Sequence, residues 1–141
     1  MTRVDFYLIS ADSERACASL ACKLAEKAYR LKHRVHLHMA DRDRAERMNE
    51  FLWTYRDGSF VPHALNTQSP LLEPVSIGSE LNVPEQADLF INLSQELPPF
   101  PERFERLAEI VDANPARKRE SRERYKQYRA QGYELATHEI S

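Results

Sequence analysis

The sequence predicts an α/β protein with a parallel sheet, and two observations carry this prediction. Short apolar, β-favouring runs alternate with segments of helical periodicity through the first 55 residues. A further apolar run, Leu89–Leu93, continues the series of strands in the second half. Strands that are separated by helices pair in parallel through right-handed crossovers. A length of 141 residues suits a single domain, residues 1–141, with a core of its own.

The first predicted helix follows a buried strand at Val4–Ile9. Asp12 or Ser13 can cap this helix, which ends near Lys32. Apolar residues at helical spacing mark its core face, and they are Cys17, Leu20, Ala21, Leu24, Ala28 and Leu31.

A second strand and a second helix follow. Arg34–Met39 alternates, with apolar residues on one side and His36 and His38 on the other. We interpret the two histidines as polar residues on a partly wetted sheet face, because two ligands are too few for a metal site. Asp41 can cap the helix at Arg42–Tyr55. The apolar side of this helix carries Ala45, Met48, Leu52, Trp53 and Tyr55.

The middle of the chain is predicted to be irregular. A turn at residues 56–59 opens a proline-punctuated stretch that extends to about residue 85 and contains one short strand, Val75–Ile77. Beyond Leu89–Leu93, the sequence predicts a turn of helix at Glu102–Glu105 and a strand at Arg106–Val111. No element is predicted for Glu134–Ile140.

The basic charge of the chain is gathered in one predicted helix near the C-terminus. Between Arg117 and Arg129 the segment carries seven Lys or Arg residues against two Glu residues. The net charge of the whole chain is −2, so the residues outside this segment sum to −7. Pro115 suits the first turn of a helix, and Gly132 suits its end.

One face of this helix combines three cations with an aromatic ring. Lys118, Arg122, Tyr125 and Arg129 are spaced four, three and four residues apart, so they share a face. We call these four residues the cationic stripe. Such a stripe can hold a carboxylate or a phosphate by charge-assisted hydrogen bonds while the ring offers an apolar surface. A second interpretation stays open, namely a solvated amphipathic helix that docks through its tyrosines.

Composition and charge restrict the classes of function. Apolar residues make up 42% and charged residues 30% of the chain, which is ordinary for a soluble globular protein. The near-neutral total charge argues against nucleic-acid binding across the whole surface. No apolar run approaches a membrane span and no signal region is present, so we expect a cytoplasmic location and no membrane partner. Cys17 and Cys22 lie on different faces of a predicted helix, which favours two small core residues over a disulfide or a metal site.

We expect neither catalysis nor a metal or cofactor, because no catalytic pattern is complete. The turn Ser10–Ser13 after the first strand contains no glycine, which excludes a Rossmann fingerprint or a Walker loop there. His63 could act as a general base, but no nucleophile in a recognisable setting accompanies it. Glu105 and Glu109 are predicted at helix starts or on solvated faces rather than as an acid/base pair.

A second candidate surface is an aromatic cluster near the end of the second helix. Its residues are Trp53, Phe60, Val61, Pro62 and His63. They either cover an edge of the core or form an exposed apolar patch of the kind that binds a protein partner.

Four stretches resemble the chi subunit of bacterial DNA polymerase III, an accessory protein of the clamp-loader complex. They are Val4–Leu8 (VDFYL), Leu52-Trp53 with Phe60–His63 (FVPH), Asp88–Leu93 (DLFINL) and Arg122–Gly132 (RERYKQYRAQG). These stretches span nearly the full chain in the family's order, and the FVPH and RxRYKxYRxxG patterns are the specific ones. The resemblance implies a mostly parallel, Rossmann-like sheet flanked by helices, with no bound nucleotide.

The resemblance also implies a non-catalytic adaptor in DNA replication. Chi-like proteins bind the psi subunit on one surface and the acidic C-terminal tail of single-stranded-DNA-binding protein (SSB), which ends in a phenylalanine carboxylate, on another. On this basis Arg122 takes the terminal carboxylate, while Lys118 and Arg129 attract the aspartates of the tail. Tyr125 walls the pocket for the terminal phenylalanine. Two further residues are implied beside that pocket, Val111 and Gly132.

The resemblance places the aromatic cluster of Trp53, Phe60, Val61, Pro62 and His63 at the psi surface, which in this family can also serve a repair helicase. Nucleic acid is then reached mainly indirectly. One alternative is direct binding of single-stranded nucleic acid by the basic helix, although only two tyrosines lie on it as stacking surfaces. Another is a small α/β enzyme with His63 as its base.

Overall fold

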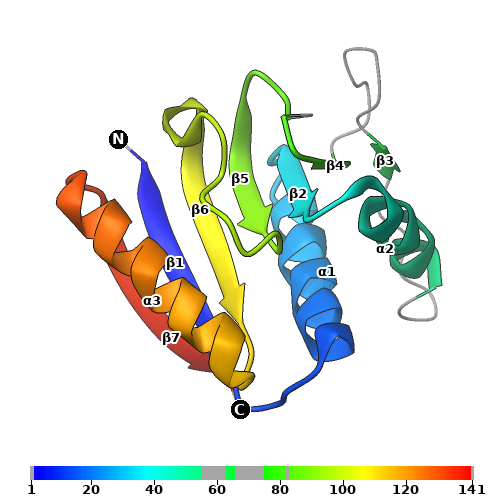
Figure 1. The fold of residues 1–141 in the computed structure, drawn as a ribbon. Helices are drawn as coiled ribbons and strands as arrows, with labels where there is room; N and C mark the ends of the chain where they lie inside the picture. Colours follow the sequence, from blue (N-terminus) through cyan, green and yellow to red (C-terminus); the bar gives the residue numbers. More distant parts are fainter. Residues whose placement is uncertain (1, 55–62, 66–74, 82, 141) are drawn as a thin grey trace.

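The described residues form a seven-stranded sheet. Figure 1 shows helices packed along this sheet. The computed structural model describes residues 2–54, 63–65, 75–81 and 83–140. The strands are β1 (Arg3–Ile9), β2 (Val35–Met39), β3 (His63–Leu65), β4 (Val75–Ser79), β5 (Ala87–Asn92), β6 (Phe104–Val111) and β7 (Glu134–Ile140). Their order is β3-β4-β2-β5-β6-β1-β7, and all neighbouring strands pair in parallel. The predicted parallel α/β fold is therefore confirmed.

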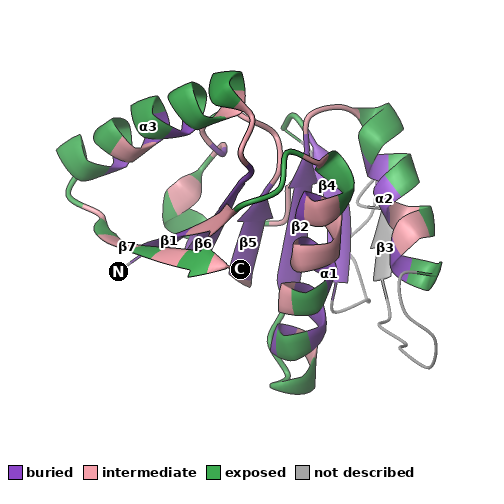
Figure 2. Ribbon diagram, turned by 90° about the horizontal axis from the view of Figure 1, so that it is seen from below, coloured by how far each residue is buried: buried purple, intermediate pink, exposed green. Residues whose placement is uncertain are grey.

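Helices cover both faces of the sheet. They are α1 (Glu14–Arg30), α2 (Arg42–Thr54) and α3 (Pro115–Ala130), together with a short 3-10 turn at Pro101–Arg103. In Figure 2, α3 covers β1, β6 and β7 on one face, while α1 and α2 lie on the other face. Each face has its own apolar cluster, a large one around Leu37 and Ile77 and a smaller one around Phe6 and Leu107. Among the described residues, no helix is long and apolar enough to cross a membrane.

The predicted caps of the first two helices are confirmed, with one correction at the end of α1. The Ser13 hydroxyl accepts a hydrogen bond from the N–H of Ala16 at 3.2 Å. Asp41 accepts one from the N–H of Arg44 at 2.8 Å. Leu31 was assigned to the core face by its spacing, but its side chain is 60% exposed. The helix ends at Arg30, so the helical periodicity no longer governs where residue 31 points.

The two histidines of β2 are buried, which corrects the expectation of a partly wetted sheet face. His36 is 0% exposed and His38 is 3% exposed. His36 Nδ1 lies 2.7 Å from the Ser76 hydroxyl, and His36 Nε2 lies 3.2 Å from His38 Nδ1. Both rings pack on Phe90. Burial lowers the pKa of His36 and brings the pKa of His38 to about 4, so both rings are neutral at neutral pH.

Two strands have no counterpart in the sequence prediction. Glu134–Ile140 forms β7, which pairs with β1 along its whole length, from Arg3 opposite Glu134 to Ile9 opposite Ile140. Its residues are exposed or only partly buried because the strand lies at the edge of the sheet, so the sequence contains no continuous apolar run at this position. His63–Leu65 forms β3 inside the stretch predicted to be irregular, and the strand predicted at Val75–Ile77 is confirmed as β4.

Glu109, which was predicted to be solvated, lies 0% exposed beneath α3. Its carboxylate accepts hydrogen bonds from Asn92 Nδ2 at 2.9 Å, Arg124 Nε at 3.1 Å and the Tyr128 hydroxyl at 2.7 Å. We call these four residues the buried anchor. Burial raises the pKa of Glu109, and the charge of Arg124 with the hydrogen bonds opposes that rise. The sequence predicted that Glu109 lies on a strand. It did not predict the burial of Glu109, because its partners on α3 lie 15 and 19 residues further along the chain.

The buried anchor predicts a large stability effect for Glu109→Gln. The substitution keeps the shape of the side chain but leaves the guanidinium of Arg124, which is 4% exposed, without a counter-charge. Breaking a buried ion pair by removing one partner costs about 3–5 kcal/mol. We expect a loss of that size in the free energy of unfolding measured by urea denaturation.

Glu105→Gln is the matched control, because Glu105 lies on the same strand and is exposed. It should stay within about 0.5 kcal/mol of the parent protein. Equal urea midpoints for the two variants would show that the anchor does not stabilise the fold.

A candidate ligand surface on helix α3

The start of α3 is fixed by polar side chains. Asn114 accepts hydrogen bonds from two backbone N–H groups of the first turn, at 3.0 and 3.1 Å, and Pro115 occupies the first turn as predicted. Arg117 donates to both carboxylate oxygens of the buried Asp112 and to Asp12 at 3.2 Å. These bonds from Arg117 hold the pKa of Asp112 below its ordinary value. Arg117 is therefore engaged within the protein and is not free to bind a ligand.

The structure divides the basic helix into two faces. Arg124 and Tyr128 belong to the buried anchor and point into the protein. Lys118, Arg122 and Arg129 are exposed, and their side chains form no ion pair or hydrogen bond with any other described residue. Figure 2 shows the outward side of α3 as exposed along its length.

The ring of the cationic stripe is anchored on the sheet. Tyr125 is partly buried, and its ring centroid lies 5.3 Å from that of Phe6 on β1. Val111 is buried in the apolar cluster against which Tyr125 packs. Gly132 follows the end of α3 with a φ of +85°, a conformation that suits glycine. The structure thus brings Lys118, Arg122, Tyr125 and Arg129 onto one helix face, as the spacing predicts.

This face has the chemistry of an anion-binding surface. Guanidinium groups offer planar, paired donors to a carboxylate or phosphate, and unpaired exposed cations need no internal ion pair to break before they bind one. The partly buried ring of Tyr125 supplies an apolar contact between them.

The second predicted surface is described only in part. Trp53 lies near the end of α2 and is 49% exposed, which favours an exposed aromatic over a cover for the core edge. The predictions for Phe60, Val61 and Pro62 lie outside the described residues. His63 begins β3, and its side chain also lies outside the description.

The described residues give no support to a metal site at the histidines of β2. His36 is hydrogen-bonded both to His38 and to Ser76. No group of three or more His, Cys, Asp or Glu residues within the described ranges could hold a metal ion. Cys17 and Cys22 are buried, as predicted, and burial raises the pKa of Cys17 to about 11.

Taken together, these features define a parallel α/β protein that lacks a glycine phosphate loop after β1 and carries an exposed cationic helix face. The family model described as DNA polymerase III chi subunit, HolC, matches residues 1–136. The chain therefore belongs to the DNA polymerase III chi subunit family and is a replication accessory subunit.

Three curated relatives are named DNA polymerase III subunit chi. The Pseudomonas aeruginosa protein is 39% identical over 99% of this chain and 98% of its own length. The Haemophilus influenzae protein is 33% identical over 96% of this chain and 95% of its own, and the Escherichia coli protein is 32% identical over 97% of each. The match thus extends over nearly the whole chain, including the two segments that carry the cationic stripe and Trp53.

The ion pair at the start of α3 predicts a pH-dependent effect for Asp112→Asn. The folded-state pKa of Asp112 is lowered, so its stabilising contribution is present above the unfolded pKa, about 3.9, and is lost as the pH falls through the folded pKa. At neutral pH the variant should lose about 2 kcal/mol of unfolding free energy, the size of hydrogen bonds to a charged group.

This difference from the parent protein should shrink below about pH 4. Urea denaturation at a series of pH values measures it. Asp43→Asn, which removes an exposed partner of Arg47, should change stability by less than about 1 kcal/mol throughout. A difference for Asp112→Asn that persists unchanged into acid would contradict the assignment.

Proposed function

We propose that this chi-family chain is a non-catalytic adaptor that links the clamp loader, through the psi subunit, to the acidic C-terminal tail of SSB during DNA replication. The observation that carries the proposal is the cationic stripe, in which Lys118, Arg122 and Arg129 surround Tyr125 and have no partner among the described residues. Membership of the family supports the replication setting.

The stripe fits the chemistry of such a tail residue by residue. Arg122 lies in the middle of the stripe and offers paired donors for the terminal carboxylate. Lys118 lies one turn before it and Arg129 two turns after it, which suits aspartates spread along an extended peptide. Tyr125 offers its ring to the terminal phenylalanine. Val111 and Gly132 are proposed to border the same contact.

A peptide ending in Asp-Asp-Xaa-Pro-Phe should bind the purified chain with a micromolar-range dissociation constant that weakens as salt is added. Fluorescence anisotropy of the labelled peptide measures this constant. Arg122→Ala should weaken binding about thirtyfold or more, because a bidentate charge pair is lost. Arg119→Ala removes an exposed arginine of the same helix outside the stripe and is the matched control. It should bind within about threefold of the parent protein, the effect of one screened charge.

A peptide with an amidated C-terminus sharpens this test. If Arg122 holds the terminal carboxylate, amidation and Arg122→Ala remove the same contact, so their effects on the free energy of binding should not add. Additive effects, or normal binding by Arg122→Ala, would remove Arg122 from the site. Full-length SSB should bind the chain, and SSB without its last residues should bind much more weakly.

Direct binding of single-stranded nucleic acid by α3 remains the competing function. Its stacking surface is small, since Tyr128 is buried in the anchor and Tyr125 is partly buried. An SSB-free oligonucleotide that displaces the peptide and is itself lost in Arg122→Ala would favour this alternative.

The surface around Trp53 is proposed to bind psi and, in the same place, a repair helicase. Trp53→Ala should reduce the amount of psi that co-purifies with the chain, since buried tryptophans at interfaces often contribute about 2 kcal/mol or more. Leu31→Ala removes a different exposed apolar side chain and should leave co-purification unchanged. Binding of the tail peptide should be the same in both variants, because α3 carries that site. Unaltered psi capture by Trp53→Ala would argue against this surface.

A further inference from the structure

A second site with the opposite charge lies at the carboxyl ends of three strands. A hollow of about 300 Å³ opens where β2, β4 and β5 end, and ligands of open parallel sheets bind at this edge. The residues that matter here are His38, Glu80, Leu81, Glu96, Leu97 and Pro99. We call this place the acidic hollow. Its volume falls at the lower end of the range for small-ligand pockets.

His38 lines the acidic hollow, and one nitrogen of its imidazole has no partner among the described residues. His38 is 3% exposed, and its Nδ1 lies 3.2 Å from His36 Nε2. Its Nε2 has no partner among the described residues, and the residue lines the hollow. Burial brings the pKa of His38 to about 4, so the ring is neutral at neutral pH and can offer a lone pair. Behind it, His36 reaches the Ser76 hydroxyl at 2.7 Å, which fixes the orientation of the pair.

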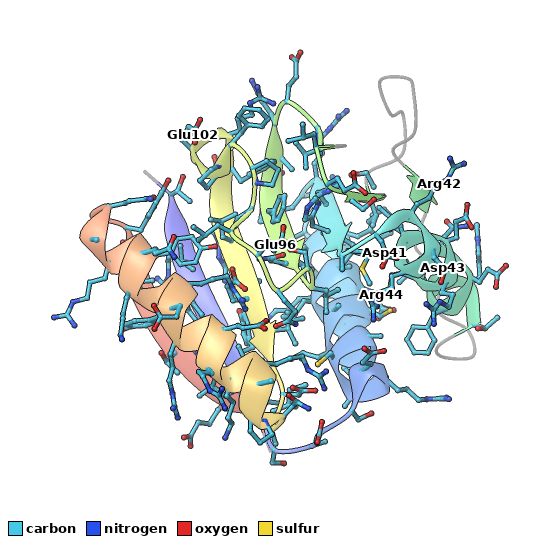
Figure 3. The ribbon with its side chains drawn as sticks, in the orientation of Figure 1. Asp41, Arg42, Asp43, Arg44, Glu96 and Glu102 are labelled. Atoms are coloured by element: carbon cyan, nitrogen blue, oxygen red, sulfur yellow. The ribbon has the colours of Figure 1, made fainter. Side chains whose placement is uncertain are left out.

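Two carboxylates at the mouth have no counter-charge. Glu80 and Glu96 are both exposed, and neither forms an ion pair with any described residue. No Lys or Arg lines the hollow. The carboxylates at the start of α2 differ, because Asp41 pairs with Arg44 and Asp43 pairs with Arg47. Figure 3 labels Asp41, Asp43 and Arg44 at this end of the helix.

The loop that carries Glu96 is held in place. Asn92, at the end of β5, donates from Nδ2 to the Glu96 carbonyl oxygen at 2.7 Å and also to Glu109 of the buried anchor. Figure 3 shows Glu96 beside the carboxyl end of β5. Leu97 and Pro99 continue this loop along the hollow, and the largely exposed Leu81 faces it from the end of β4. The hollow therefore combines apolar side chains with the hydrogen-bond acceptors of His38, Glu80 and Glu96.

We propose that the acidic hollow receives an arginine side chain of a partner protein. The guanidinium would donate to Glu80, Glu96 and the lone pair of His38 Nε2, three acceptors for a group with five donors. Leu81, Leu97 and Pro99 would cover its methylene stem. The matching tautomers have His38 Nδ1–H donating to His36 Nε2, and His36 Nδ1–H donating to Ser76. This site lies apart from the cationic stripe, so it does not depend on SSB-tail binding.

The test uses N-acetyl-argininamide, which presents the side chain without free termini, and follows the ring resonances of His38 in the full chain by NMR at low salt. We expect a saturable shift of the His38 resonances. The exposed pair Glu80→Gln/Glu96→Gln should weaken the probe about tenfold or more. The control pair Glu102→Gln/Glu105→Gln removes two exposed carboxylates that do not line the hollow and should leave binding unchanged.

Two further probes make the result decisive. N-acetyl-citrullinamide has the same shape without the charge and should fail to saturate the shift. Free arginine should bind no more tightly than the capped form; tighter binding would assign the hollow to a metabolite and overturn the proposal. A shift that does not saturate, that citrulline reproduces, or that survives the Glu80→Gln/Glu96→Gln substitutions would equally overturn it.

Discussion

Glu109 reaches from β6 into the space under α3, and its contacts decide which side of that helix meets solvent. The helix has no apolar stripe, since its buried residues are Ser121, Arg124 and Tyr128. Apolar packing alone would leave its rotation weakly determined, because several rotations would bury similar surfaces. A carboxylate that must meet Arg124 Nε and the Tyr128 hydroxyl together allows one rotation. That rotation turns the cationic stripe outward.

The same reasoning explains how much of the site could be predicted from sequence. The spacing of Lys118, Arg122, Tyr125 and Arg129 is a local property of a helix, so their shared face could be predicted from the sequence. Arg122 and Arg124 are the same residue type two positions apart, yet one is exposed and the other is 4% exposed. Their difference is set by Glu109 on another element, and pairing across elements has no local signal.

The central strands could be predicted from the sequence for a related reason, whereas the prediction missed the strands at the two edges of the sheet. Buried parallel strands such as Leu89–Leu93 are continuous apolar runs, which periodicity detects. The edge strand β7 has a half-exposed face and depends on pairing with β1, at the opposite end of the sequence. In β2, the alternation of apolar and polar residues correctly predicted the strand, but it also implied that His36 and His38 face solvent. Burial followed instead from Phe90 and Ser76, which neighbouring strands supply.

The buried anchor holds α3 at a cost in desolvation free energy. Removing two charges from water costs several kcal/mol, and an apolar group of similar volume often serves stability as well or better. The Nη1 nitrogen of Arg124 is buried and has no hydrogen-bond partner, so the ion pair is not fully compensated. A buried charge pair specifies geometry more strictly than apolar contact does, because a rotated helix would leave both charges unpaired. The arrangement thus trades stability for a defined orientation, and a surface that must present three free cations in register depends on orientation more than on stability.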